Sequence, residues 1–172
     1  MPASSSLSAK AATATKCPRG MRLIKSKKRG NYCIDTHEFP GAGATPKTRV
    51  SWFQAKSACE ADGKRLCELG EWRGACGSRY PYGKGFDANK CNTADEDGFE
   101  RSIAKTGSFK ECRSRSGAYD MVGNVHEWVA EQRIAGGGFE SDEEVGSCRY
   151  SSPKSPASSA AYIGFRCCAV PE

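Results

Sequence analysis

The strongest helical pattern in the chain covers residues 51–63. Apolar side chains recur there on one face, from Trp52 to Cys59. A serine and a glutamine three residues apart form a capping box at its start, and Gly63 stands where a helix would end. A second, shorter helix is predicted from Leu69 to Cys76. Both helices carry cysteines that face inward, so we expect each helix to be tied to a distant strand.

Short apolar runs near both ends of the chain predict strands. The first two lie around Met21–Leu23 and Tyr32–Ile34, on either side of a basic turn. The segment from Arg133 to Phe139 is predicted to be a strand whose glycines allow close backbone approach. Tyr162 to Val170 suits a buried terminal strand, and the serine-rich segment from Ser141 to Ala161 is expected to be loop.

Residues 77–116 contain few periodic apolar positions and many glycine, asparagine and aspartate residues. An irregular segment of this length is unusual in a compact domain unless something orders it. A cation bound by the acidic run Asp95–Asp97 would do so. A disulfide between Cys91 and Cys112 would also close the loop.

Composition indicates one domain with a small core. The chain has 172 residues, of which 38% are hydrophobic and 19 are glycine. Residues 1–16 are polar and aperiodic, so we expect a flexible tether followed by a folded domain over residues 17–172. Ten cysteines can supply disulfides worth ~2–4 kcal/mol each. Cysteine at this density indicates an oxidising compartment, and the lack of any Cys-x-x-Cys argues against a zinc ribbon.

No apolar run approaches membrane-spanning length, and residues 1–16 lack the apolar centre of a secretory leader. The cysteines still point to export. We therefore expect the chain as given to begin after a removed leader or lipid anchor, and the protein to be secreted, periplasmic or on the cell surface. The net charge of +6 is spread along the chain. Lys105, Lys110, Arg113 and Arg115 form either a basic patch or, as we favour, a solvated face, and no nucleic-acid motif accompanies them.

Candidate chemistry concentrates in the stretch Gly117–Trp128. Asp120 and Glu127 flank two backbone turns, at Gly123 and Val125. Two carboxylates around exposed carbonyls suit a hard cation such as calcium, which takes several oxygen ligands at once. The alternative is a turn that leads into a buried strand.

Five motifs stand in a recognisable order along the chain. They are Val50–Leu66, Glu71-Trp72, Asp120–Trp128, Gly136-Gly137 and Gly164–Cys167. Together they resemble the formylglycine-generating enzyme (sulfatase-modifying factor) family, from about the first cysteine to the end of the chain. The resemblance implies an α+β fold, a variant of the C-type lectin-like fold. Two helices would pack on twisted antiparallel sheets, with much irregular structure.

The resemblance also implies two structural calcium sites. The second site corresponds to the Asp120 and Glu127 side chains with the carbonyls of Gly123 and Val125. Asp120 stands where the family often has asparagine, and its charge should tighten the site. The implied ligands of the first site are the Asn92 and Asp97 side chains and the carbonyls of Thr93 and Phe99, with Asn89 as an alternative.

The resemblance implies only two of the five disulfide pairings. By position in the family, Cys59 resembles the partner of Cys167, and Cys76 resembles the partner of Cys148. The first pair would close a loop of roughly 110 residues, for which chain entropy predicts ~4–5 kcal/mol. The remaining pairs follow from proximity and elimination, and they are Cys17–Cys33, Cys91–Cys112 and Cys67–Cys168.

The catalytic chemistry of the family is where this chain departs. Family enzymes oxidise a substrate cysteine with copper held by two thiolates, because copper(I) prefers soft ligands. Ser141 falls where the first thiolate belongs, and the second falls near Gly146. Cys148 lies two residues beyond and suits a disulfide better. We therefore do not expect copper.

Histidine chemistry is also poorly supported. A related branch of the family uses iron bound by histidines, but this chain has only His37 and His126. His126 stands at the position of a family tryptophan, and with Glu127 it would supply only two of the ligands that a zinc site needs. For His37 we favour a surface or hydrogen-bonded structural role.

The sequence therefore predicts a non-catalytic, calcium-ordered and disulfide-rich extracellular recognition module. Its ligand would be a protein, peptide or glycan, bound through the Ser141–Ala161 loop with Ser141, Arg149 and Tyr150. The alternative is a copper-dependent oxidase that acts on a cysteine of a substrate protein. A third hypothesis is a structural role in self-assembly.

Overall fold

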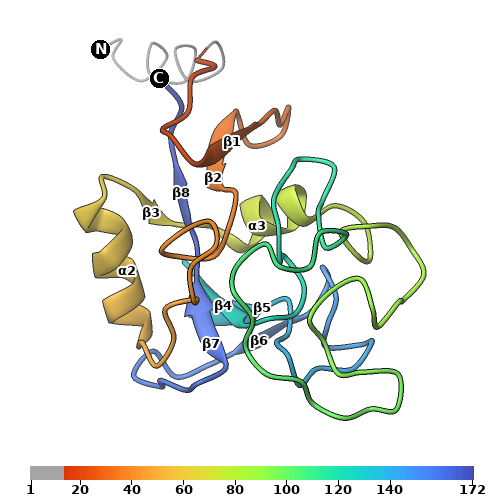
Figure 1. Ribbon diagram of the computed structural model, residues 1–172. Helices are drawn as coiled ribbons and strands as arrows, with labels where there is room; N and C mark the ends of the chain where they lie inside the picture. The colour runs from red at the N-terminus through yellow and green to blue at the C-terminus, as the bar shows by residue number, and fades with distance from the viewer. Residues whose placement is uncertain (1–13) are drawn as a thin grey trace, which may run out of the picture.

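The computed structural model describes residues 14–172. The tether expected over residues 1–16 therefore lies almost entirely outside the described residues. Within them, two helices and two four-stranded sheets form the fold (Figure 1). The first sheet has the order β1 (Met21–Ile24), β2 (Tyr32–Asp35), β8 (Cys167–Ala169) and β3 (Arg65–Leu66). The second has the order β6 (Ser151–Pro153), β5 (Arg133–Ala135), β4 (His126–Val129) and β7 (Ile163–Phe165).

The first sheet is antiparallel throughout, and its opening hairpin confirms the two predicted N-terminal strands. Met21 pairs with Asp35, and β2 continues the sheet to β8. The second sheet is mixed, because β4 and β7 run parallel. The predicted antiparallel pairing holds for the other strand pairs, and only β4 and β7 depart from it. A long connection separates β4 from β7 in sequence, which leaves room for the parallel crossover.

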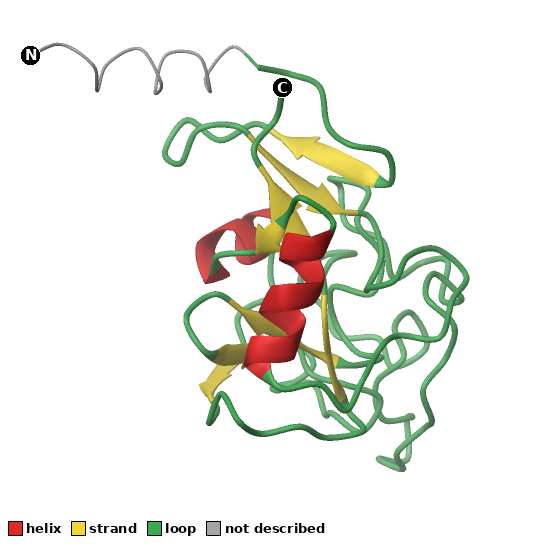
Figure 2. Cartoon of the chain, turned by 90° about the vertical axis from the view of Figure 1, so that its left-hand side faces the viewer, coloured by secondary structure: helices red, strands yellow, loops and turns green. Residues whose placement is uncertain are grey.

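Helix α2 (Trp52–Ala61) begins at the predicted capping box, where the Ser51 side chain accepts the backbone N–H of Gln54. Its buried face is short, because only Ala55 and Cys59 are fully enclosed. These residues pack in a cluster with strands β3, β4, β7 and β8. Figure 2 shows α2 in front of the strands. Helix α3 (Leu69–Cys76) has the predicted bounds and buries Trp72 in a second cluster.

Three predicted segments differ in the structure. The strand expected from Arg133 to Phe139 ends at Ala135, because the next two residues are glycines at positive φ. The segment from Ser141 to Ala161 contains β6, which pairs with β5. The terminal run from Tyr162 to Val170 splits into β7 and β8, which belong to different sheets.

All ten cysteines lie within the described residues, and each is in a disulfide. All five predicted pairs are confirmed: Cys17–Cys33, Cys59–Cys167, Cys67–Cys168, Cys76–Cys148 and Cys91–Cys112. The last one closes part of the irregular segment 77–116, in which the structure has only isolated bridges and turns. At the top of the domain, Lys16 and Glu172 exchange two backbone hydrogen bonds, so the two ends lie side by side.

Candidate functional site

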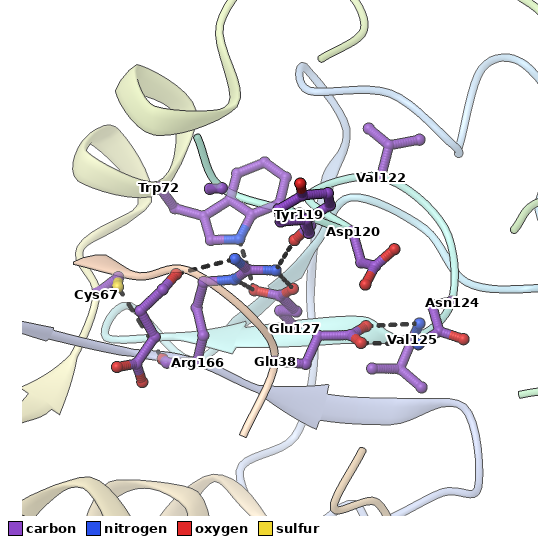
Figure 3. A network of polar contacts seen from close by, with 12 residues as sticks. Glu38, Cys67, Trp72, Tyr119, Asp120, Val122, Asn124, Val125, Glu127 and Arg166 are labelled. Carbon is purple, nitrogen blue, oxygen red and sulfur yellow. Dashed lines mark hydrogen bonds and ion pairs between the residues drawn. The ribbon is translucent and has the colours of Figure 1, made fainter. Parts of the chain in front are cut away.

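The centre of the domain is a buried ion pair between Arg166 and Glu127 (Figure 3). Arg166 Nη2 donates to Glu127 Oε1 at 2.7 Å, and Nε donates to Oε2 at 2.8 Å. The indole of Trp72 donates to the same Oε2 at 2.8 Å. Other guanidinium hydrogens reach the carbonyls of Asp35 and Tyr119, at 3.1 Å and 2.7 Å. Arg166 lies between β7 and β8, at the point where the predicted terminal strand is divided in two.

Two more carboxylates approach this pair. Glu38 is fully buried and accepts hydrogen bonds from Asn124 Nδ2 at 2.7 Å and from the Val125 N–H at 3.3 Å. Asp120 Oδ2 accepts the N–H of Gly107 at 2.6 Å. Burial raises the pKa of Asp120 to about 6, and burial with the charges of Asp120 and Glu127 raises the pKa of Glu38 well above its usual range. The site therefore holds more carboxylates than cations.

Asp120 and Glu127 belong to the second predicted calcium site, and the donor chemistry around them fits calcium. Oxygen ligands and an excess of buried negative charge are what a hard cation needs. Within residues 14–172, however, no three His, Cys, Asp or Glu side chains are arranged to hold a metal, so a cation here would rely on backbone carbonyls as well. Both oxygens of Glu127 are already bonded to Arg166. Glu38 was not among the predicted ligands, and nothing in its sequence context distinguishes it from a surface acid.

An arginine side chain, that of Arg101, contacts one predicted ligand of the first calcium site, the Thr93 carbonyl, and the alternative ligand Asn89. Arg101 Nη1 donates to the carbonyls of Ala88 at 2.7 Å and Thr93 at 2.9 Å, and lies 3.4 Å from that of Cys91. Its Nη2 lies 3.4 Å from Asn89 Oδ1. One guanidinium thus faces the converging oxygens that a cation would take. While Arg101 donates to these oxygens, they are not free to bind calcium.

The remaining predicted ligands of the first site are also occupied or turned away. Asn92 Nδ2 donates to Ser102 O and to Asn124 Oδ1, each at 2.9 Å. The Phe99 carbonyl accepts the N–H of Asp95 at 2.9 Å, and the Phe99 side chain is 69% exposed. Asp97 is exposed.

We expect Arg101→Met to lower the free energy of unfolding by about 1–3 kcal/mol, because carbonyls that now accept a charged donor would lose it. Urea unfolding of the variant and the parent measures this difference. Arg149→Met is the matched control, because Arg149 is exposed and only its backbone carbonyl has a hydrogen bond here. Equal effects of both changes would show that Arg101 has no special role.

The positions of the two family thiolates are closed to copper. Ser141 is buried, and its Oγ accepts the N–H of Gly138 at 2.9 Å. At Gly146, an added Cβ would lie 2.8 Å from Asp142 O and 3.0 Å from Thr93 Cγ2. A cysteine side chain therefore has no room there. Cys148, the nearest sulfur, is bonded to Cys76.

His126 pairs with Glu140 rather than with its neighbour Glu127. Its Nε2 lies 2.7 Å from Glu140 Oε1, and its Nδ1 is buried without a partner. The ring makes edge contacts with Tyr150 and Tyr162. The arrangement supplies two zinc ligands at most.

The other histidine, His37, stacks on Tyr119 with ring centroids 4.9 Å apart. It thus has the structural role that the sequence favoured.

A pocket of about 570 Å³ opens beside Ser141. Five carboxylates line it, from Asp95, Glu96, Glu140, Asp142 and Glu143. Neither Arg149 nor Tyr150 is among its lining residues. Tyr150 packs against His126, whose partner Glu140 precedes Ser141 in the chain, and Arg149 is exposed. The role of these three residues in ligand binding stays a prediction.

Solved structures with this architecture cover nearly the whole chain. Treponema denticola variable protein 1 superimposes with a TM-score of 0.69 at 15% identity, over 92% of this chain and 93% of that one. PvdO from Pseudomonas aeruginosa superimposes with a TM-score of 0.68 at 15% identity, over 92% of this chain and 98% of that one. The U1 variant of Major Tropism Determinant superimposes with a TM-score of 0.65 at 17% identity, over 92% of this chain and 54% of that one. Two helices on two small sheets, bridged by long irregular loops, define an α+β protein of the C-type lectin-like class.

The family follows from sequence comparison. The Sulfatase-modifying factor enzyme 1-like domain matches residues 19–170, and the chain belongs to that family. A relative from Bos taurus, "Inactive C-alpha-formylglycine-generating enzyme 2", is 31% identical in an alignment 161 positions long that covers 74% of this chain and 53% of the relative. The Mus musculus protein of the same name is 29% identical over 74% of this chain and 52% of its own length. The chain thus spans about half the length of these relatives.

Proposed function

We propose that this domain is a non-catalytic recognition module on a formylglycine-generating-enzyme-like scaffold. One observation carries the proposal: every cysteine is in a disulfide, so no thiolate pair is left for copper. The closed positions at Ser141 and Gly146 support it. So does the word "Inactive" in the names of the two mammalian relatives. A protein, peptide or glycan ligand would bind near the pocket beside Ser141.

Free thiols test the proposal directly. We expect essentially none when the denatured, non-reduced protein is titrated with a thiol reagent, because all ten sulfurs are paired. We also expect no stoichiometric copper(I) binding, measured by competition with a chromophoric chelator. The reduced and denatured protein is the positive control and should show all ten thiols. Two free thiols that bind one copper(I) would support the competing oxidase.

The disulfide framework and the relatives favour an extracellular or secretory location, since disulfides form and persist in oxidising compartments, and this chain has five. Within the described residues, no helix is both long and apolar enough to cross a membrane. Self-association remains the third hypothesis, which sedimentation of the pure protein would reveal.

Calcium is proposed at the second site only. Asp120 and the Gly123 and Val125 carbonyls would hold the ion, with the Glu127 carboxylate, and it would balance the buried acidic charge. Arg101 already supplies a positive charge at the first site. The bound ion would order the loops of the irregular segment, which is a structural role and not a catalytic one.

We therefore expect one calcium ion per chain, measured by isothermal titration, and a melting temperature that rises on adding calcium to chelator-treated protein. Asp120→Ala should abolish the heat signal, because of the two predicted carboxylate ligands of this site, Asp120 and Glu127, it removes the one that has no ion pair with an arginine. Asp97→Ala is the matched control, and it should leave binding unchanged because Asp97 is exposed. Two ions per chain, or loss of binding in the control, would contradict the assignment.

A further inference from the structure

A second pocket, of about 730 Å³, lies at the end of helix α3. It is walled by the segments 77–84 and 113–116 and is separate from the pocket beside Ser141. Its charged lining residues are Lys84, Arg113 and Arg115, and no aspartate or glutamate is among them. This pocket and the pocket beside Ser141 thus have opposite charge.

The cations of this pocket lack counter-ions. None of Lys84, Arg113 and Arg115 takes part in an ion pair found in the described residues. Arg113 is held over the ring of Tyr119, with its guanidinium carbon 5.6 Å from the ring centroid. This contact fixes its position without neutralising its charge.

A fourth cation lies beside them. Arg22 Nε and Arg113 Nη2 come within 3.1 Å and 3.5 Å of the point that a Cβ on Gly117 would occupy. Two guanidinium groups therefore lie side by side, from strand β1 and from the segment 113–116. Like charges this close repel one another unless an anion lies near both. Glycine at position 117 leaves the space that they occupy.

The neutral groups of the pocket are already bonded. Ser78 Oγ donates to Gly83 O at 2.8 Å, and Ser116 Oγ donates to Ala75 O at 2.8 Å. The latter bond covers one carbonyl at the end of α3. The partial negative charge of a helix end is about half an elementary charge, which is small beside the full charges of Lys84, Arg113 and Arg115. The net potential of the pocket is positive.

We propose that this pocket binds a tetrahedral oxyanion, the sulfate or phosphate group of an ester ligand. Forked guanidinium groups bind such oxygens in pairs, and several cations around one cavity suit an anion of more than one charge. The proposal does not depend on the non-catalytic assignment. Of the four basic residues named from the sequence, only Arg113 and Arg115 line this pocket, and Lys105 and Lys110 do not.

Titration of ¹⁵N-labelled protein with inorganic sulfate, and separately with inorganic phosphate, tests the proposal through the arginine Nε–H resonances. We expect saturable shifts of Arg113 and Arg115 at millimolar anion. Arg113→Ala/Arg115→Ala should weaken binding at least about tenfold. The control Lys27→Ala/Lys28→Ala removes the same net charge from the exposed β1–β2 turn and should leave the affinity unchanged.

Arg115→Ala alone is the second variant, in case the double variant does not fold. Among the described residues, the Arg115 side chain has no hydrogen bond, ion pair or ring contact that the single change would remove. It should still weaken binding several-fold. Preference for one of the two anions identifies the ester class. Absence of saturation up to about 100 mM of either anion, or equal weakening in the lysine control, would overturn the proposal.

Discussion

Arg166→Met is expected to lower the free energy of unfolding by about 3–5 kcal/mol, the usual cost of removing one partner of a buried ion pair. The loss follows from the geometry, because Arg166 is fully buried and both of its bonds to Glu127 would vanish. Glu127 would then be a buried charge with only the Trp72 indole as donor. Denaturant unfolding followed by tryptophan fluorescence measures the change.

Two further variants separate the effect of losing the positive charge from the effect of losing the forked guanidinium geometry. Arg166→Lys keeps the positive charge but not the fork, so it should cost less than the methionine variant. Arg166→Met combined with Glu127→Gln removes both charges, and it should be more stable than Arg166→Met alone. A loss below about 1 kcal/mol in Arg166→Met would mean that the buried pair contributes little net stability.

Removing the disulfide Cys59–Cys167 with serines is expected to cost about 4–5 kcal/mol. The bond joins residues 108 apart in sequence, and the entropy that it removes from the unfolded chain grows with that separation. The serine variant should therefore unfold at lower denaturant concentration, which equilibrium unfolding of the non-reduced protein measures.

The disulfide Cys17–Cys33 is the internal reference, because its cysteines are only 16 residues apart. Chain entropy predicts a cost of about 3 kcal/mol for its removal, and so a smaller shift. If the short loop proved as costly as the long one, local packing rather than chain entropy would govern the contribution of these bonds.

The helices and the outer strands could be predicted because their signals are local. The capping box at Ser51 and the glycine at position 63 define α2, and alternating apolar residues define the hairpin of β1 and β2. Strand β6, in contrast, is a polar serine-rich segment. It forms because β5 offers it an edge, which no local pattern reveals.

The candidate sites show the same limit at the level of single residues. A motif identifies Asp120 and Glu127, but it does not show that Arg166 occupies the Glu127 carboxylate from 39 residues away. Likewise, no local pattern predicts that Arg101, in an irregular segment, will donate to the carbonyls of residues eight and thirteen positions earlier. These contacts arise from tertiary packing, so they could not be predicted from the spacing of residues.

The paired ends at Lys16 and Glu172 have a mechanical consequence. A force that pulls these ends apart would first separate their two backbone hydrogen bonds one after the other, in a zipper-like manner. The tension would then pass through Cys17–Cys33 and Cys59–Cys167, so that the chain between Cys33 and Cys59 would be the longest segment able to lengthen. That segment of about 26 residues spans roughly 90 Å when stretched, so the oxidised domain would act as a short tether under load.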